Sequence, residues 1–212
     1  MSASRIACLV VLWAGSCLPV SAAQLFFSRD FPGSSPAYFD ITIEADGAAA
    51  YREAPDEDPL KFQVDAATVT ELLNRAEAVE ALGPSVASKR KVAFTGNKVL
   101  RLSDDGRQQE AKFMYSENQD AQYVVSWFLK AAETIGHRIN LERAVRFDRL
   151  GVNDALLQLQ GAFERDRVVA ADQLIPVLEQ ITGQEKILHL ARSRAAALLE
   201  RIQAAEPAPA AP

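Results

Sequence analysis

The feature that most constrains this fold is a pair of strand-like runs over residues 37–53, joined at Asp46-Gly47. Polar and apolar residues alternate over Tyr38–Glu44, which gives a strand one wet face and one core-facing face. Asp-Gly supplies the positive φ angles that a tight hairpin turn needs. The second run is small except for Tyr51, so another element can approach it closely. The sequence therefore predicts a β-hairpin within a sheet.

The first 23 residues have the pattern of a secretory signal peptide. Arg5 supplies a positive charge, and an almost wholly apolar run follows over residues 6–13. Small residues at 21–23 offer a signal-peptidase site, so we expect cleavage after Ala22 or Ala23 and a periplasmic or secreted protein. The apolar run is far shorter than the roughly 20 residues that cross a bilayer, so no transmembrane span is expected after cleavage.

Both cysteines, Cys8 and Cys17, fall within this leader. Small residues precede Cys17, which leaves a lipoprotein tethered through Cys17 as an alternative. Ala14 stands where leucine is usual in lipoprotein signals, so we favour simple cleavage. The expected mature chain has no cysteine, and this excludes a cysteine nucleophile and a thiolate zinc site.

The rest of the chain divides into a strand-rich part, residues 24–115, and a helical part, residues 116–203. One amphipathic helix is predicted over residues 66–80, with Asp65 as its N-cap. This pattern is typical of an α+β fold with an N-terminal antiparallel sheet, one covering helix and an all-α C-terminal segment. The predicted strands cover residues 24–29, 38–44, 48–52, 60–64, 92–95, 98–103 and 107–115.

The helical part begins at a possible capping box formed by Ser116 and Gln119. Apolar residues at helical spacing predict that the first helix docks on the sheet and ends near Gly136. A Trp127-Phe128 stripe also fits a ligand groove, although such spacing ordinarily marks core. The full stripe is Val124, Trp127, Phe128, Ala131 and Ile135.

Shorter helices are predicted over residues 141–150, 154–163, 172–182 and 185–203. Asn153 is expected to cap the second of these, with Val152 and Leu157 as a hydrophobic staple. The Pro/Ala tail over residues 204–212 is expected to be disordered.

One short motif suggests a family. The run Gly33-Ser34-Ser35-Pro36-Ala37-Tyr38, followed by the Asp46-Gly47 turn and Tyr51, resembles an uncharacterised family of exported bacterial domains. That family shows Gly-x-Cys-Pro-x-Tyr before such a hairpin, whereas this chain has Ser35 at the cysteine position. The likeness covers residues 25–115 at most, and it implies export and fold without a catalytic residue.

Candidate catalytic side chains are scattered through the sequence. Ser34 and Ser35 lie in a Gly/Pro loop that lacks the nucleophile-elbow motif. His137 and His189 are the only histidines, and neither has a partner at metal-binding spacing. Since no motif links a nucleophile, a base and an orienting group, we expect neither a metal site nor a cofactor site.

Charged clusters are interpreted first as solvated surface. Carboxylate pairs at Asp104-Asp105 and at Asp148 with Asp154 suit turns and caps as well as acid-base chemistry. The acidic loop over residues 53–59 lacks the regular oxygen spacing of a calcium loop. The clusters of cations are Lys89-Arg90-Lys91 and the set Arg192, Arg194 and Arg201.

The net charge of the chain limits the kinds of partner that it can bind. The formal charge of −5 becomes −6 when Arg5 is removed, which disfavours nucleic acid. We therefore expect a non-catalytic binding or structural protein of the bacterial cell envelope, with a protein as a possible partner. The alternatives are an exported hydrolase using a carboxylate or Ser34/Ser35 site, and a lipoprotein tethered through Cys17.

Overall fold

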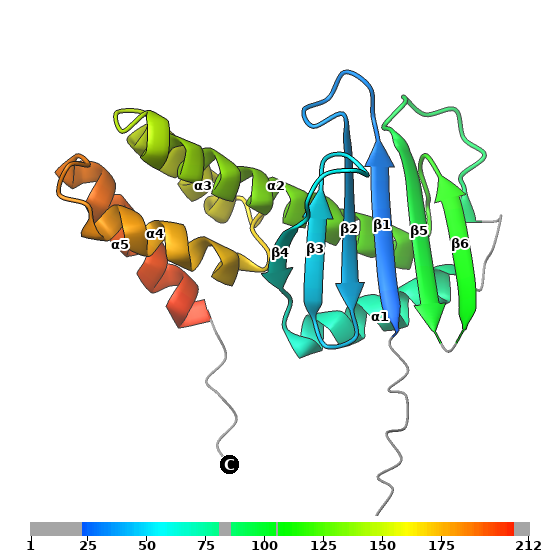
Figure 1. The fold of residues 1–212 in the computed structure, drawn as a ribbon. Coiled ribbons are helices and arrows are strands. Elements are labelled where there is room, and N and C mark those ends of the chain that lie inside the picture. The colour runs from blue at the N-terminus through cyan, green and yellow to red at the C-terminus, as the bar shows by residue number, and fades with distance from the viewer. Residues whose placement is uncertain (1–22, 81–85, 105, 206–212) are drawn as a thin grey trace, which may run out of the picture.

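The computed structural model describes residues 23–80, 86–104 and 106–205, and the statements below concern these residues. Within them the protein is α+β, with an antiparallel sheet in the N-terminal half followed mostly by helices (Figure 1). Residues 1–22 of the predicted leader, Cys17 included, lie outside the described residues, and so does most of the predicted tail. None of the described helices combines the length and the apolar character that a membrane span requires.

The sheet has six strands in the order β4-β3-β2-β1-β5-β6, with every neighbouring pair antiparallel. The predicted hairpin is confirmed as β2 and β3. Gly47 has φ +85°, and the Asp46 carboxylate accepts a 2.9 Å hydrogen bond from the Ala48 amide. The strands are β1 Gln24–Asp30, β2 Tyr38–Glu44, β3 Ala48–Arg52, β4 Leu60–Gln63, β5 Asn97–Asp104 and β6 Arg107–Phe113.

The strand predicted over residues 92–95 is wrong, because that segment is a loop. Its polar groups bond to other parts of the chain rather than to a strand ladder. The Thr95 hydroxyl donates to the Met114 carbonyl at 3.0 Å, and the Thr95 carbonyl accepts from Lys98 Nζ at 3.2 Å. These contacts hold the loop across the end of the sheet.

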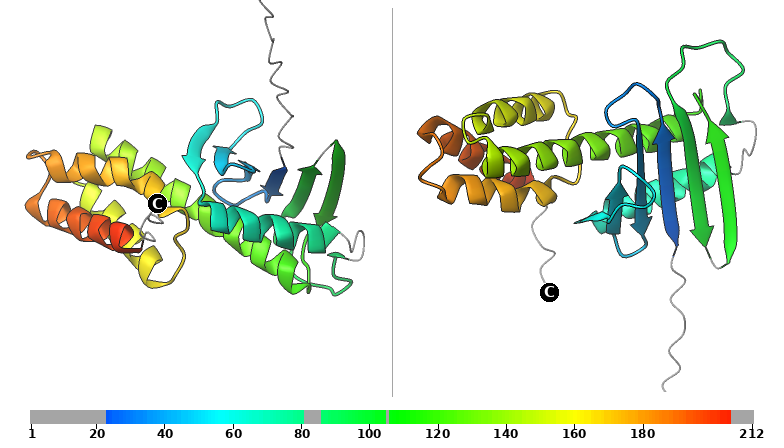
Figure 2. Two further views of the ribbon diagram at one scale, coloured as in Figure 1. Left: turned by 90° about the horizontal axis from the view of Figure 1, so that it is seen from below. Right: turned by 45° about the horizontal axis from the view of Figure 1, so that its top comes forward.

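Two helices cover one face of the sheet (Figures 1 and 2). Helix α1, Ala66–Glu80, lies against β5 and β6, and helix α2, Gln119–Phe147, lies against α1 and β2. The predicted Asp65 cap is confirmed, because its carboxylate accepts a 2.9 Å hydrogen bond from the Thr68 amide. The predicted stripe on α2 is buried, and Phe128 stacks on Phe27 at 4.8 Å between ring centroids.

Helix α2 is the longest element described, and its side chains contribute to two hydrophobic cores. Gly136 does not end it, so the predicted pair of helices is one continuous helix of 29 residues. Its first half joins the core under the sheet, whereas Leu141 and Val145 join a second core among the later helices. The predicted capping box is also wrong, because the Asn118 side chain caps the helix through the Ala121 amide.

The second core is closed by three further helices at one end of the sheet (Figure 2). These are α3 Val152–Glu164, α4 Ile175–Gly183 with a preceding 3₁₀ turn at Ala171–Leu174, and α5 His189–Ala205. The predicted Asn153 cap and its staple are wrong. Helix α3 already begins at Val152, which is buried, whereas Leu157 is 46% exposed.

Replacing Gly136 with alanine is expected to stabilise the protein by about 0.5–1 kcal/mol, because glycine is unfavourable inside a helix. No atom lies within 4 Å of the position of an added Cβ at Gly136, apart from its own helix backbone and chain neighbours. Urea unfolding of the wild type and of Gly136→Ala measures the effect. A lower midpoint in the variant would show that α2 bends at this residue.

Candidate ligand-binding groove

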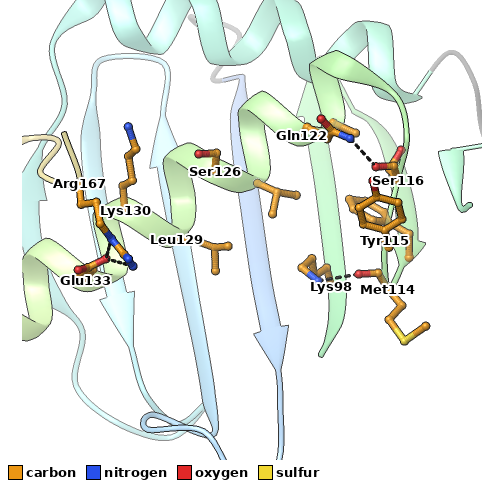
Figure 3. Close-up of a pocket in the computed structure, with 13 residues that line it drawn as sticks. Lys98, Met114, Tyr115, Ser116, Gln122, Ser126, Leu129, Lys130, Glu133 and Arg167 are labelled. Carbon is orange, nitrogen blue, oxygen red and sulfur yellow. Dashed lines mark hydrogen bonds and ion pairs between the residues drawn. The ribbon is translucent and has the colours of Figure 1, made fainter. Parts of the chain in front are cut away.

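A groove runs along the side of α2 that faces the end of β6. We call it the α2 groove, and it consists of two pockets of about 370 Å³ and about 410 Å³. Leu129, Glu133 and Arg167 line both pockets, so the two are neighbours along one face of the helix. Figure 3 shows the first of them from the side of the helices, with the sheet behind α2.

The first pocket is largely apolar. Val125 and Leu129 come from α2, and Phe113 and Met114 come from the end of β6 and the residue after it. These α2 residues lie beside the buried stripe rather than on it, so neither Trp127 nor Phe128 lines the pocket. The stripe is therefore core, as its spacing indicates, and the groove uses the adjacent face of the same helix.

Two cations lie at core-facing positions of the sheet beside this apolar wall. Arg29 on β1 and Lys98 on β5 are direct cross-strand partners, and both line the groove. Like charges placed opposite each other destabilise a strand pair. Burial lowers the pKa of both side chains, and the charge of Arg29 lowers the pKa of Lys98 further. Such a pairing favours an anion in the groove.

The two cations differ in their present partners. Lys98 Nζ donates to the Met114 carbonyl at 2.6 Å and to the carbonyls of Thr95 and Gly96 at 3.2 Å. Arg29 has no carboxylate partner in the described part of the chain, and its guanidinium lies 4.8 Å from the Phe31 ring centroid. Arg29 is therefore the cation that is available to a ligand.

An ion pair marks the boundary between the two pockets. Arg167 donates to Glu133 at 2.6 Å, and the other oxygen of Glu133 lies 4.0 Å from His137 Nε2 (Figure 3 shows the ion pair). Burial, together with the nearby Arg165 and Arg167, lowers the pKa of His137, although Glu133 opposes this shift. His137 is therefore neutral at pH 7, and its buried Nε2 has no hydrogen-bond partner in the described structure.

The structure brings some predicted site residues together and separates others. Ser35 and His137 line the same pocket of the α2 groove, on the β1–β2 loop and on α2. Ser34 is not part of that lining, and its hydroxyl bonds to the carbonyls of Phe31 and Pro36 at 2.8 and 2.7 Å. His189 lies far along the chain at the start of α5, where its ring contacts Ser193.

The remaining charged candidates have local roles. The Asp148 carboxylate accepts from the Gly151 amide at 3.1 Å in the turn after α2. Arg194 bonds to Asn153 and to Gln160, and Arg201 bonds to the Phe163 carbonyl, so both tie α5 to α3. Among the described residues, no three histidine, cysteine or acidic side chains are grouped as a metal site requires.

Sequence reasoning missed the groove because its wall is assembled from distant segments. Arg29, Lys98 and Arg167 come from β1, β5 and the loop after α3. One signal was present in the sequence: Lys98 interrupts the apolar alternation that continues at Leu100 and Leu102. A cation at a core-facing position of a strand indicates either an unusual internal bond or a binding site. Comparison with known protein families, curated proteins and solved structures finds no match.

Proposed function

We propose that this chain is an exported, non-catalytic binding protein of the bacterial cell envelope, and that the α2 groove holds its ligand. The observation that carries the proposal is an apolar pocket of about 370 Å³ whose neighbouring pocket is lined by Arg29, a cation with no carboxylate partner in the described residues. Small-molecule sites have volumes of about 300–1,000 Å³ and combine apolar walls with a few polar groups. The predicted leader supports a periplasmic or secreted location.

The chemistry of the groove favours an anionic amphipathic ligand, such as a long-chain carboxylate. An alkyl chain fits against Phe113, Val125 and Leu129, which are all apolar. Val125 and Leu129 are partly exposed, whereas Phe113 is buried. A carboxylate head fits beside Arg29, because guanidinium and carboxylate form strong paired hydrogen bonds. The whole chain is acidic, so this local positive charge is a distinctive feature of the groove.

Dodecanoate is expected to bind the protein, whereas dodecyltrimethylammonium is expected not to bind. Calorimetric titration below the micelle concentrations measures both. Arg29→Gln should weaken dodecanoate binding about tenfold or more, because a hydrogen bond to a charged group is worth about 1.5–3 kcal/mol. Leu129→Asp should weaken it at least as much, because it places a like charge in the apolar wall.

Two control variants separate the groove from general surface effects. Arg107→Gln removes an exposed cation at the start of β6, and Leu157→Asp alters an exposed leucine on α3. Both should bind dodecanoate like the wild type. Equal binding of the two amphiphiles, or equal losses in groove and control variants, would refute the proposed site. The mass of the protein from its own host shows whether its N-terminus is Ala23 or Gln24, or a lipid-modified Cys17.

The alternative function is ester hydrolysis at Ser35, and one observation favours it. Ser35, His137 and Glu133 line one pocket, which is the combination of a hydroxyl, an imidazole and a carboxylate. No hydrogen bond joins Ser35 to His137 in the described structure, so the nucleophile is not activated there. Labelling of Ser35 by a fluorophosphonate, lost in His137→Gln, would favour the hydrolase over the binding protein.

A further inference from the structure

The connection between α2 and α3 presents two large apolar side chains to solvent. Phe147 and Leu150 are each 76% exposed, more than any other large apolar side chain described in the chain. The turn that carries them is ordered by hydrogen bonds, because the Asp148 amide donates to the Ala144 carbonyl and the Gly151 amide donates to the Asp148 carbonyl. We call the set formed by Phe147, Leu150, Arg143, Arg146 and Arg149 the distal tip.

Three arginines lie close to these apolar side chains in the sequence. Arg143 and Arg146 lie on the last turns of α2, and Arg149 lies in the turn. None of the three pairs with a carboxylate of the described chain, since the nearby Glu142 is bound by Arg138 at 2.8 Å. The Arg146 guanidinium lies 5.7 Å from the ring centroid of Phe147.

The surrounding elements neutralise this charge only in part. Asp148 lies within the turn, where it accepts from the Gly151 amide, and Asp154 lies exposed on the first turn of α3, so these two carboxylates offset part of the charge of the three arginines. The connection between α4 and α5 lies at the same end of the helical half and adds one carboxylate, Glu185, and one cation, Lys186 (Figures 1 and 2). Leu188 in that connection is itself half exposed. This end of an acidic protein therefore combines net positive charge with exposed apolar side chains.

We propose that the distal tip docks on an anionic lipid surface. Phe147 and Leu150 enter the boundary between headgroups and acyl chains, where their apolar surface leaves water. The arginines remain at the headgroup level and contact lipid phosphates, which attract basic residues near the surface of an anionic membrane. The tip is a projecting turn at the end of a helix pair, a shape that suits insertion between headgroups.

The test is flotation with vesicles, using the protein as its own host processes it. Vesicles of phosphatidylcholine mixed with phosphatidylglycerol should carry the protein, and vesicles of phosphatidylcholine alone should carry much less. The double variant Phe147→Ser, Leu150→Ser should reduce the partition coefficient about tenfold or more. Replacing Arg143, Arg146 and Arg149 with glutamine should reduce it about fivefold per arginine.

The matched control is the double variant Leu157→Ser, Leu190→Ser, which removes two other exposed leucines from the helical half. It should float like the wild type. A lipid modification at Cys17 would tether all variants equally, so equal flotation of wild type, tip variants and control overturns the proposal. Absence of flotation with either vesicle also overturns it. Flotation only with vesicles that contain envelope proteins would assign the tip to a protein partner.

A second measurement keeps the proposal open to refutation even if a tip variant folds poorly. Phe147→Trp places an indole at the distal tip, while the native Trp127 is buried in the core under the sheet. The emission of the Phe147→Trp variant should shift to shorter wavelength when anionic vesicles are added. An unchanged emission maximum in vesicle-bound protein would show that the tip stays in water.

Discussion

Truncating Trp127 to alanine is expected to lower the free energy of unfolding by about 3–5 kcal/mol, a large share of the 5–15 kcal/mol typical of a domain. Trp127 is 8% exposed, lies in the core beneath the sheet and meets Phe128 edge to face at 5.4 Å. Because α2 continues from this core into the second one, we expect both halves of the molecule to lose protection together. Urea unfolding and hydrogen exchange measure the two effects.

The control for Trp127 is Tyr123→Ala on the same helix. Tyr123 is 36% exposed and its ring lies 4.0 Å from the Arg75 guanidinium, so its loss should cost about 1 kcal/mol or less. If exchange in Trp127→Ala rises in β2 and α2 while α5 keeps its wild-type protection, the two cores unfold independently. The prediction that the two cores unfold together through α2 would then be wrong.

Replacing Gly47 with valine is expected to cost about 3 kcal/mol or more, because two separate effects add. The φ of +85° strains any residue with a Cβ, and a β-branched one most. In addition, the new Cβ would overlap the Val64 carbonyl, next to the 2.9 Å hydrogen bond from the Val64 amide to the Gly47 carbonyl. The substitution therefore disturbs the β2–β3 turn and the end of β4 together.

Gly106→Val supplies the comparison for Gly47→Val. Gly106 has φ +78°, and nothing lies within 4 Å of a Cβ added there. It should therefore show the backbone strain without the collision, and cost less than Gly47→Val in the same urea unfolding experiment. Equal costs at the two positions would show that β4 moves away from the turn freely.

Local signals in the sequence predicted the parts of the fold that depend on few residues. Asp46-Gly47 determines its turn through backbone conformation, and the Asp65 carboxylate caps α1 by accepting a hydrogen bond from the amide three residues ahead. The stripe on α2 was equally clear, because burial at Val124 and Phe128 follows directly from helical spacing. Each of these predictions requires only neighbours in the chain or one apolar face.

The wrong predictions share a different physical cause, which is contact between distant segments. A glycine often ends a helix, yet α2 passes through Gly136 because Leu141 and Val145 pack into the second core. The segment over residues 92–95 has strand composition, but Thr95 and Lys98 bond across to Met114. The groove itself depends on Arg29 and Arg167 meeting beside α2, and no local pattern in the sequence reports that meeting.

The length of α2 has a mechanical consequence. At a rise of 1.5 Å per residue, its 29 residues span about 43 Å, from Gln119 beside β6 to Phe147 at the far end. A stiff rod that pivots where it touches the sheet acts as a lever. A tilt of about 5° about the contact at Phe128 displaces Phe147, which lies about 28 Å further along the helix, by roughly 2.5 Å. The stacking of Phe27 on Phe128 therefore fixes the direction of α2 as well as contributing to the core, and small changes at this contact move the α2–α3 turn.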